Sequence, residues 1–173
     1  MQDIVLHTCV GFEVRLLEKQ HGIAIFKLLE PDALDRQAVT PEMYYQDRLT
    51  LKEEINFALY RKNYNSVGLF KNNVLIGICF SSITDDDQKQ PWLGYFYVEN
   101  SYRKTRASSM LMNYILNILY KGYTVQVGPS GSSKSMYDKL IEFKALEGGY
   151  YAFKDEVSKR LAKIYSSCNE GKE

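Results

Sequence analysis

The sequence of 173 residues has no long hydrophobic run and no excess of charge of one sign. No segment approaches the roughly 18 apolar residues that a membrane-spanning helix needs, and no cationic stretch precedes an apolar one at the N-terminus, so we expect neither membrane association nor secretion. The 22 basic and 21 acidic residues give a formal charge of +1, which provides no broad field to attract nucleic acid. Any anion site must therefore be a local cluster.

Cysteine and histidine are also scarce. The three cysteines, Cys9, Cys79 and Cys168, are odd in number and lack the paired spacing of a zinc site, so we expect no metal centre. Cys79 lies inside an apolar run, and the pattern favours the reduced core or surface thiols of a cytoplasmic protein over disulfides. His7 and His21 lie in the weakly patterned N-terminal region, where surface or packing roles are expected rather than acid–base chemistry.

The length suits a single domain over residues 1–173 that buries a sizeable core. Residues 12–16 alternate apolar and polar side chains and indicate a strand, which a turn could continue as a hairpin with residues 23–28. A threonine–proline helix start indicates a helical region over residues 41–62, with a second start near residue 49.

The rest of the chain continues to alternate strand-like and helical patterns. Helical spacing of apolar residues begins at Lys104 and stops at Gly122, and this is the clearest helix in the sequence. Four further strands are indicated, at residues 67–70, 74–83, 92–98 and 123–127. After them come a helix over residues 133–143, a short strand over 150–153 and an amphipathic helix through Ile164. The order predicts an α/β fold around one mixed sheet.

The segment GPSGSSKS, residues 128–135, resembles the phosphate-binding loop of a nucleotide hydrolase. It lies between a strand pattern and a helix pattern, as such a loop requires. However, Ser133 stands where the loop needs glycine, and too few residues follow Ser135 to build the rest of a hydrolase sheet. We therefore favour a connection that caps the next helix, with nucleotide binding as a minor alternative.

Three cations, Arg103, Lys104 and Arg106, lie at the start of the clearest helix. Basic residues are more usual at helix C-termini, whereas the amides and dipole of a helix start attract anions. The cluster is either a solvated basic turn or a pyrophosphate site, and the second interpretation gives all three cations a reason.

The same stretch resembles the cofactor signature of the GNAT superfamily, the acyl-CoA-dependent N-acyltransferases. In that family a valine ends the fourth strand, an aromatic–arginine pair follows, and a glycine-rich turn opens a helix. Val98, Tyr102-Arg103 and the apolar pair Leu111-Met112 match this signature. Arg106 and Ser108 replace its two glycines, which normally let backbone amides close on a diphosphate. Arg106 either crowds the turn or grips a phosphate itself.

A second similarity lies closer to the C-terminus. The run Tyr137-Asp138-Lys139-Leu140, followed by Phe143, matches a motif in a later helix of the family, without the glycine that usually precedes the phenylalanine. The element order is also similar over residues 10–153. The resemblance therefore implies a GNAT-like fold with a mixed, largely antiparallel central sheet of about six strands flanked by helices. It also makes residues 128–135 the connection between the fifth strand and this helix.

The resemblance implies an N-acetyltransferase that transfers an acetyl group from acetyl-CoA to an amine. It assigns the binding of this co-substrate to the end of the fourth strand and the helix start: Val98, Arg103, Lys104, Arg106, Ala107, Ser108 and Ser109. It also implies that Tyr137 protonates the leaving thiolate, which suits a phenol with a pKa near 10. Because the glycines are replaced, a fold relative that binds a partner without catalysis is the alternative.

The general base and the acceptor are not evident from the sequence. The family often draws a glutamate from the fourth strand, but residues 92–98 contain no carboxylate. Glu99 is the nearest acid, and the alternatives are a water chain or the acidic loop at Asp85–Asp87. The acceptor, a small molecule or a protein amine, is expected near the first helices, where several tyrosines suit either packing or recognition: Tyr44, Tyr45, Tyr60 and Tyr64. The same aromatic region could form a homodimer face.

Overall fold

The computed structural model describes residues 3–34, 41–83, 90–128, 141–145 and 151–169. Within these residues, eight strands form one sheet in the order β1-β2-β3-β4-β5-β6-β8-β7. The strands are β1 (Val5–Cys9), β2 (Phe12–Leu16), β3 (Tyr64–Lys71), β4 (Val74–Ile83), β5 (Pro91–Val98), β6 (Gln126–Val127), β7 (Ile141–Ala145) and β8 (Tyr151–Phe153). Neighbouring strands are antiparallel except for the parallel pair β5 and β6. The predicted mixed, largely antiparallel sheet is confirmed, and β1 and β7 add two strands to the expected six.

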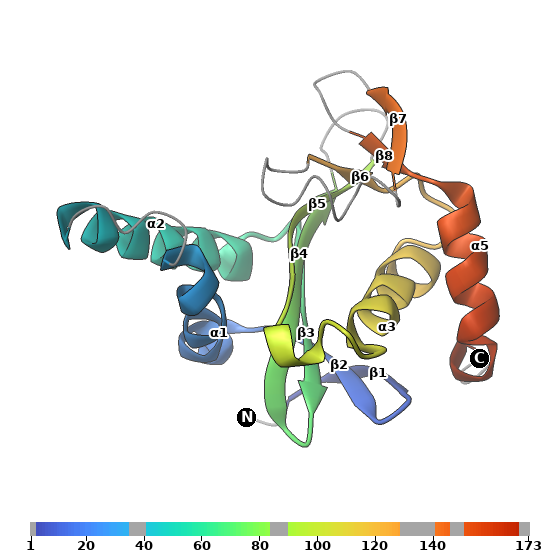
Figure 1. Cartoon of the computed structure of the whole chain (residues 1–173), viewed down its shortest axis with the longest axis horizontal. Coiled ribbons are helices and arrows are strands. Elements are labelled where there is room, and N and C mark those ends of the chain that lie inside the picture. The colour runs from blue at the N-terminus through green and yellow to red at the C-terminus, as the bar shows by residue number, and fades with distance from the viewer. Residues whose placement is uncertain (1–2, 35–40, 84–89, 129–140, 146–150, 170–173) are drawn as a thin grey trace.

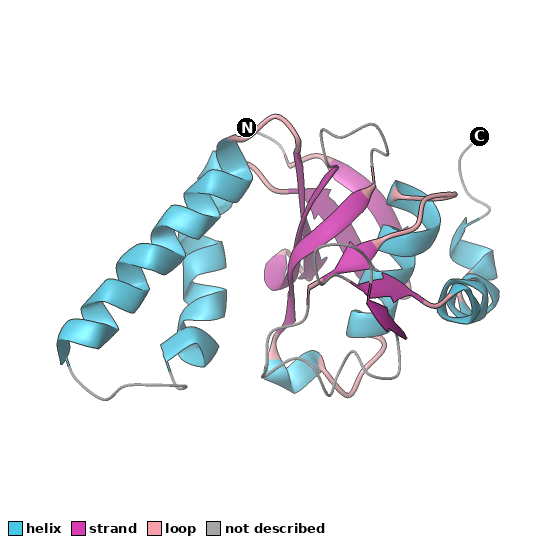
Figure 2. Ribbon diagram, turned by 90° about the horizontal axis from the view of Figure 1, so that it is seen from above, coloured by secondary structure: helices cyan, strands magenta, loops and turns pink. Residues whose placement is uncertain are grey.

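Helices cover both faces of this sheet (Figures 1 and 2). One face carries α1 (Gly22–Leu34) and α2 (Pro41–Tyr60). The other face carries α3 (Ala107–Asn113), its π-helical continuation η3 (Tyr114–Leu119), α5 (Asp155–Ile164) and the short α6 (Ser166–Asn169). Two 3-10 turns, η1 (Lys19–His21) and η2 (Asn100–Tyr102), precede α1 and α3 respectively.

Each face of the sheet buries its own apolar core, because successive side chains of a strand point to opposite faces. The core under α3 and α5 includes Val14, Leu69, Ile76, Met110, Leu111 and Ile115. The core under α1 and α2 includes Leu17, Ile25, Leu29, Ile55, Ile78 and Phe80. The strands between them are therefore apolar on both sides, which explains the nearly continuous hydrophobic runs of β3 and β4.

The hairpin of β3 and β4 forms as predicted. Asn72 and Asn73 connect the strands with φ values of 50° and 63°. Asparagine tolerates this left-handed conformation, which a two-residue hairpin turn requires at both positions. The predicted glycine stop after the long helix is also present, since Gly122 has a φ of 85°.

Three local predictions are wrong. Residues 23–28 do not form a hairpin strand but belong to α1, and β2 pairs instead with the preceding β1. The helix α2 is continuous through residue 49, so the expected second helix start lies inside a helix that packing on the sheet holds together. Residues 141–143 belong to β7 and not to a helix, because pairing with β8 overrides their helical spacing; the preceding residues 133–140 lie outside the described part of the chain.

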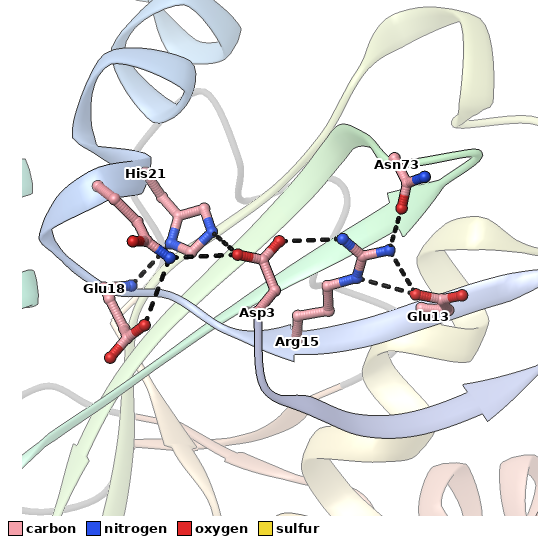
Figure 3. A network of polar contacts seen from close by, with 7 residues as sticks. Asp3, Glu13, Arg15, Glu18, His21 and Asn73 are labelled. Carbon is pink, nitrogen blue, oxygen red and sulfur yellow. Dashed lines mark hydrogen bonds and ion pairs between the residues drawn. The ribbon is translucent and has the colours of Figure 1, made fainter. Parts of the chain in front are cut away.

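A polar network secures the N-terminal segment (Figure 3). The guanidinium of Arg15 bonds Asp3, Glu13 and Asn73, and it lies 4.6 Å from the centroid of the Phe70 ring. His21 accepts the Glu18 backbone amide at Nδ1 (2.9 Å), so Nε2 carries the ring proton and faces Asp3 Oδ1 at 3.2 Å. Both nitrogens of His21 are therefore used in the fold, in agreement with the packing role expected for it.

A disulfide between Cys9 and Cys168 corrects the prediction that all cysteines are reduced. The two residues are 159 positions apart, so no sequence spacing announces their pairing; the fold brings them together at the ends of β1 and of the C-terminal helices. The cysteine pattern consequently no longer argues for a cytoplasmic location. Cys79 is a free, buried thiol, as its apolar surroundings indicated. Among the described helices, none combines the length and the apolarity of a membrane span.

Candidate active site

The parallel strands β5 and β6 pair over a short distance. Trp92 faces Gln126 and Leu93 faces Val127. Beyond these pairs β5 continues to Val98, and among the described strands only β4 accompanies it there. The described parallel pairing thus ends well before β5 does.

A β-bulge lies where this pairing ends. The register between β4 and β5 shifts between Phe80 and Ser81, which leaves Gly94 as an extra residue on β5. A Cβ atom on Gly94 would lie 2.7 Å from Cζ3 of Trp92, so only glycine fits beside this ring in its present position. The bulge redirects β5 at the point where it loses β6.

A compact turn follows the other end of β5. The Tyr102 amide donates to the Glu99 carbonyl oxygen at 2.9 Å. Arg103 Nε donates to the Val98 carbonyl at 2.7 Å, and its guanidinium carbon lies 5.0 Å from the centroid of the Tyr97 ring. Arg103 therefore ties the turn back onto the strand as well as contributing charge.

The first turn of α3 presents backbone amides. The Ala107 amide donates to Thr105 Oγ1 at 3.2 Å. Other first-turn amides of a helix have no carbonyl partner within it, so those of Ser108 and Ser109 suit an anion. Arg106 precedes them with φ −72° and ψ −3°, which any residue adopts, so arginine in place of a signature glycine causes no backbone strain.

The structure gathers the predicted cofactor residues around this turn. Val98 and Ala107 are buried and anchor the strand end and the helix start in the core. Arg103, Lys104 and Arg106 are exposed. Since Arg103 is engaged with β5, Lys104 and Arg106 are the cations best placed to meet an anionic group beside the amides of α3. The charge of these residues suits a diphosphate.

A pocket of about 450 Å³ opens beside the bulge, on the face that α2 covers. Its aromatic walls are Phe57 of α2, Tyr64 of β3, Phe80 of β4, and Trp92 and Tyr95 of β5. Phe57 and Tyr64 meet edge to face with centroids 5.3 Å apart. The remaining lining residues are Glu53, Glu54, Ala58 and Gly94. Aromatic rings together with carboxylates suit a cation carried on a small apolar body.

Glu54 is the pocket residue with altered acid–base chemistry. Desolvation at the pocket wall raises the pKa of its carboxyl above the usual value, although much of the residue is exposed. A raised pKa makes the carboxylate of Glu54 a stronger base, which suits the role of a general base near neutral pH. Glu53, its neighbour on α2, adds negative charge to the same pocket.

Glu99, the sequence candidate for the base, lies elsewhere. Its carboxylate accepts a hydrogen bond from Ser101 Oγ at 2.9 Å, and it does not line the pocket. It follows Gly94 by five positions, or about 16 Å along an extended strand. Tyr137, Lys134 and Asp85–Asp87 lie outside the described residues, so the proposed acid role of Tyr137 stays a prediction.

Sequence reasoning missed Glu53 and Glu54 as site residues. Glu53 follows Thr50 by three positions, a spacing typical of a helix-capping box, which favours a purely structural role. The available signal was weak: two acids and a phenylalanine within one helical turn, on a helix that was expected to flank the acceptor. Tyr64 lines the pocket, whereas the centroid of the Tyr60 ring lies 4.1 Å from Nζ of Lys19. The side chains of Tyr44 and Tyr45 lie outside the described part of the structure.

No family model matches the sequence, and no curated protein is significantly similar to it. Solved structures do match. PaiA N-acetyltransferase from Thermoplasma acidophilum, in complex with coenzyme A, aligns with a TM-score of 0.62 and 15% identity over 83% of this chain and 97% of its own. The chain has the GNAT fold. FdhC, described as a nucleotide-linked sugar GNAT, aligns with a TM-score of 0.65 and 17% identity over 95% of this chain and 99% of its own.

A GNAT-family acetyltransferase from Streptococcus pneumoniae adds a further match, with a TM-score of 0.53 and 14% identity over 82% of this chain and 96% of its own. These comparisons confirm the GNAT resemblance at the level of the fold. The strand pairing argues against a nucleotide hydrolase. The sheet of such an enzyme is largely parallel, whereas the described sheet has a single parallel pair. Among the described residues, no group of three or more potential ligands is placed to hold a metal ion.

Proposed function

We propose that the protein is an N-acetyltransferase that uses acetyl-CoA as co-substrate and a cationic amine as acceptor. One observation carries the proposal: β5 has an anion-suited turn at one end and, at the bulge near its other end, an aromatic pocket with two carboxylates. A transferase that joins an anionic donor to a cationic acceptor needs two such sites along one path. The PaiA relative with bound coenzyme A and the same fold supports this assignment.

The donor site is the turn after Val98 together with β5 up to the bulge at Gly94. Lys104, Arg106 and the amides of Ser108 and Ser109 hold the diphosphate of the donor. Val98 and the Ala107 helix start keep that turn in place. When bound, acetyl-CoA would supply the thioester, and this stretch of β5 would hold its pantetheine arm.

The acceptor occupies the pocket beside the bulge as an ammonium ion. The rings of Trp92, Phe57 and Tyr95 surround its apolar body, and Glu53 attracts its charge. Glu54 removes a proton so that the neutral amine can attack the thioester carbonyl. Tyr137 protonates the departing thiolate, the role implied by the family resemblance.

A non-catalytic coenzyme A binder is the second candidate. It rests on the replacement of both signature glycines by Arg106 and Ser108. The relaxed backbone at Arg106 weighs against loss of the site, because the turn keeps a helix start without glycine. This candidate shares the donor site and differs only in the absence of turnover.

The test combines binding with turnover. Calorimetric titration with acetyl-CoA is followed by measurement of thiol release in the presence of amines: an arylalkylamine, an aliphatic diamine, a peptide N-terminus and a nucleotide-linked amino sugar, the last suggested by the FdhC relative. We expect micromolar donor binding and turnover with at least one cationic amine. Binding without turnover for the whole panel favours the non-catalytic candidate, and no binding at millimolar acetyl-CoA overturns both.

A further inference from the structure

The C-terminal segment contacts the cofactor turn through one phenol. Tyr165 follows α5 directly, and its side chain is almost fully buried in the core under α3 and α5. Figure 1 shows α5 lying alongside α3 on the outer side of this face. The phenol oxygen of Tyr165 is 2.7 Å from Ser109 Oγ and 3.3 Å from the Arg106 carbonyl oxygen.

These contacts close a small hydrogen-bonded triangle at the helix start. Ser109 Oγ also donates to the Arg106 carbonyl at 3.1 Å, and the same carbonyl accepts the Met110 amide at 2.9 Å. The two hydroxyls have one proton each, so they make two of the three contacts of the triangle at a time, and the Arg106 carbonyl accepts the Met110 amide and at least one hydroxyl. Because Arg106 precedes the amides that would hold a diphosphate and Ser109 carries one of them, the phenol contacts both sides of the proposed anion site.

A covalent bond holds the phenol's own segment. Cys168 lies three positions after Tyr165, and its amide donates to the Tyr165 carbonyl at 2.9 Å. Its sulfur is bonded to Cys9, which is buried at the end of β1 with 3% exposure. The disulfide therefore attaches the segment that carries Tyr165 to the edge strand β1, although the two cysteines are 159 positions apart in the sequence.

We propose that Tyr165 is a positioning residue for the cofactor turn, and that the Cys9–Cys168 disulfide keeps it in place, so that reduction of this bond weakens donor binding. The inference rests on the proposed donor site. In the chemical step, two thiols of a reductant give two electrons and two protons, the bond between the two sulfurs breaks, and two cysteine thiols and one reductant disulfide form. After reduction no covalent bond joins the segment of Tyr165 to β1, and the hydrogen bonds of Tyr165 are left to hold this segment against α3.

The experiment measures donor affinity in both redox states. Desulfo-coenzyme A serves as the probe because it carries no thiol that could exchange with the protein. Titrations compare oxidised protein with protein reduced by a phosphine, and mass spectrometry of the Cys9–Cys168 peptide pair verifies each state. We expect reduction to raise the Kd about 3- to 10-fold, a loss of the size of one or two hydrogen bonds.

Variants separate positioning from mere stability. Tyr165→Phe keeps the buried ring and removes the hydroxyl, and we expect a similar rise in Kd together with a smaller further effect of reduction. Cys168→Ser should bind like the reduced wild type and be insensitive to the phosphine. Tyr123→Phe, at an exposed tyrosine, is the matched control and should behave as wild type. If Tyr165→Phe binds as tightly as wild type, the positioning role is overturned; equal affinities of oxidised and reduced protein overturn the redox coupling.

Hydrogen exchange gives a readout independent of donor binding. Reduction and Tyr165→Phe should both accelerate exchange of amides 108–113, relative to those of β3 and β4. This arm still decides on positioning if no form of the protein binds the probe, a result that would reject the proposed donor site alone. Unchanged exchange at these amides in both comparisons rejects the positioning role itself, and it does not depend on whether Cys168→Ser folds.

Discussion

The two ends of β5 present opposite chemistry. The turn after Val98 is exposed and cationic, and it leads into the backbone amides of a helix start. The pocket at Gly94 is concave and aromatic, and its charged groups are the carboxylates of α2. The turn therefore suits an anionic group that stays exposed to solvent. The pocket suits a cation that loses its water shell on binding. Predictions that separate the two ends test whether one strand organises both halves of a transfer reaction.

The largest effect is expected at the pocket end. Glu54→Gln removes the proposed base while keeping the side-chain shape, and should lower kcat about 10²- to 10⁴-fold with unchanged acetyl-CoA affinity. Because desolvation raises the pKa of Glu54, activity should fall as the pH decreases through that raised pKa, where the carboxylate becomes protonated. Steady-state kinetics over a pH series measure both effects. Glu156→Gln, an exposed glutamate in the first turn of α5, is the control, and equal kcat values for the two variants would exclude Glu54 as the base.

The next effect is expected at the turn. If Arg106 grips the donor phosphates, Arg106→Gly costs about 1.5 to 3 kcal/mol of binding free energy, the value of a charge-assisted hydrogen bond, and flattens the salt dependence. If the arginine only crowds the turn, the glycine variant binds more tightly. Calorimetry with coenzyme A at two salt concentrations separates these outcomes, with Lys159→Ala on α5 as a control for loss of a surface cation. The grip is the expected result, because the helix start needs no glycine backbone there.

Removal of the Cys9–Cys168 bond should also lower the stability of the whole molecule, beyond its proposed effect on the donor end of β5. Disulfides that close long loops typically contribute about 2 to 5 kcal/mol to the free energy of unfolding. Cys168→Ser should therefore lower stability in denaturant titrations by an amount in this range. Wild type treated with reductant provides the comparison, and a reduced wild type as stable as the oxidised form would show that the tether is dispensable.

A smaller effect is expected from the N-terminal network. The hydrogen bond from Arg15 holds the pKa of Asp3 below its ordinary value of 3.8. A carboxyl with a lowered folded-state pKa contributes stability above its unfolded pKa and loses it as the pH falls through the folded value. The stability difference between wild type and Asp3→Asn should accordingly be constant near neutral pH and shrink in acid. A difference that grows as the pH falls would contradict this role.

The least effect is expected from Lys134→Ala. If residues 128–135 are a connection and not a phosphate-binding loop, acetyl-CoA binding and turnover should be nearly unchanged. Titration with ATP and magnesium on the same variant checks the alternative. Wild-type binding of ATP that disappears in Lys134→Ala would restore the nucleotide interpretation.

The two ends of β5 also differ in how far their residues can be predicted from the sequence. The turn is local: Val98, Arg103 and the helix start are contiguous, so spacing and charge predict their juxtaposition. The pocket joins α2 to β3, β4 and β5, and nothing in the sequence around Glu54 indicates which strand faces it. Likewise the hairpin at Asn72-Asn73 follows from turn chemistry, whereas the Cys9–Cys168 pair and the strand β7 depend on distant segments that meet only in the folded sheet.

The most direct test of the account is a comparison of Glu54→Gln with the double variant Lys104→Ala/Arg106→Ala in acetyl transfer to a cationic amine, with donor affinity measured by calorimetry on the same preparations. We predict that the pocket variant loses kcat and keeps donor affinity, whereas the turn variant loses donor affinity, more so at low salt, and keeps kcat at saturating acetyl-CoA. Loss of donor affinity in Glu54→Gln, or unchanged affinity in the turn variant, would contradict the division of β5 into a donor end and an acceptor end.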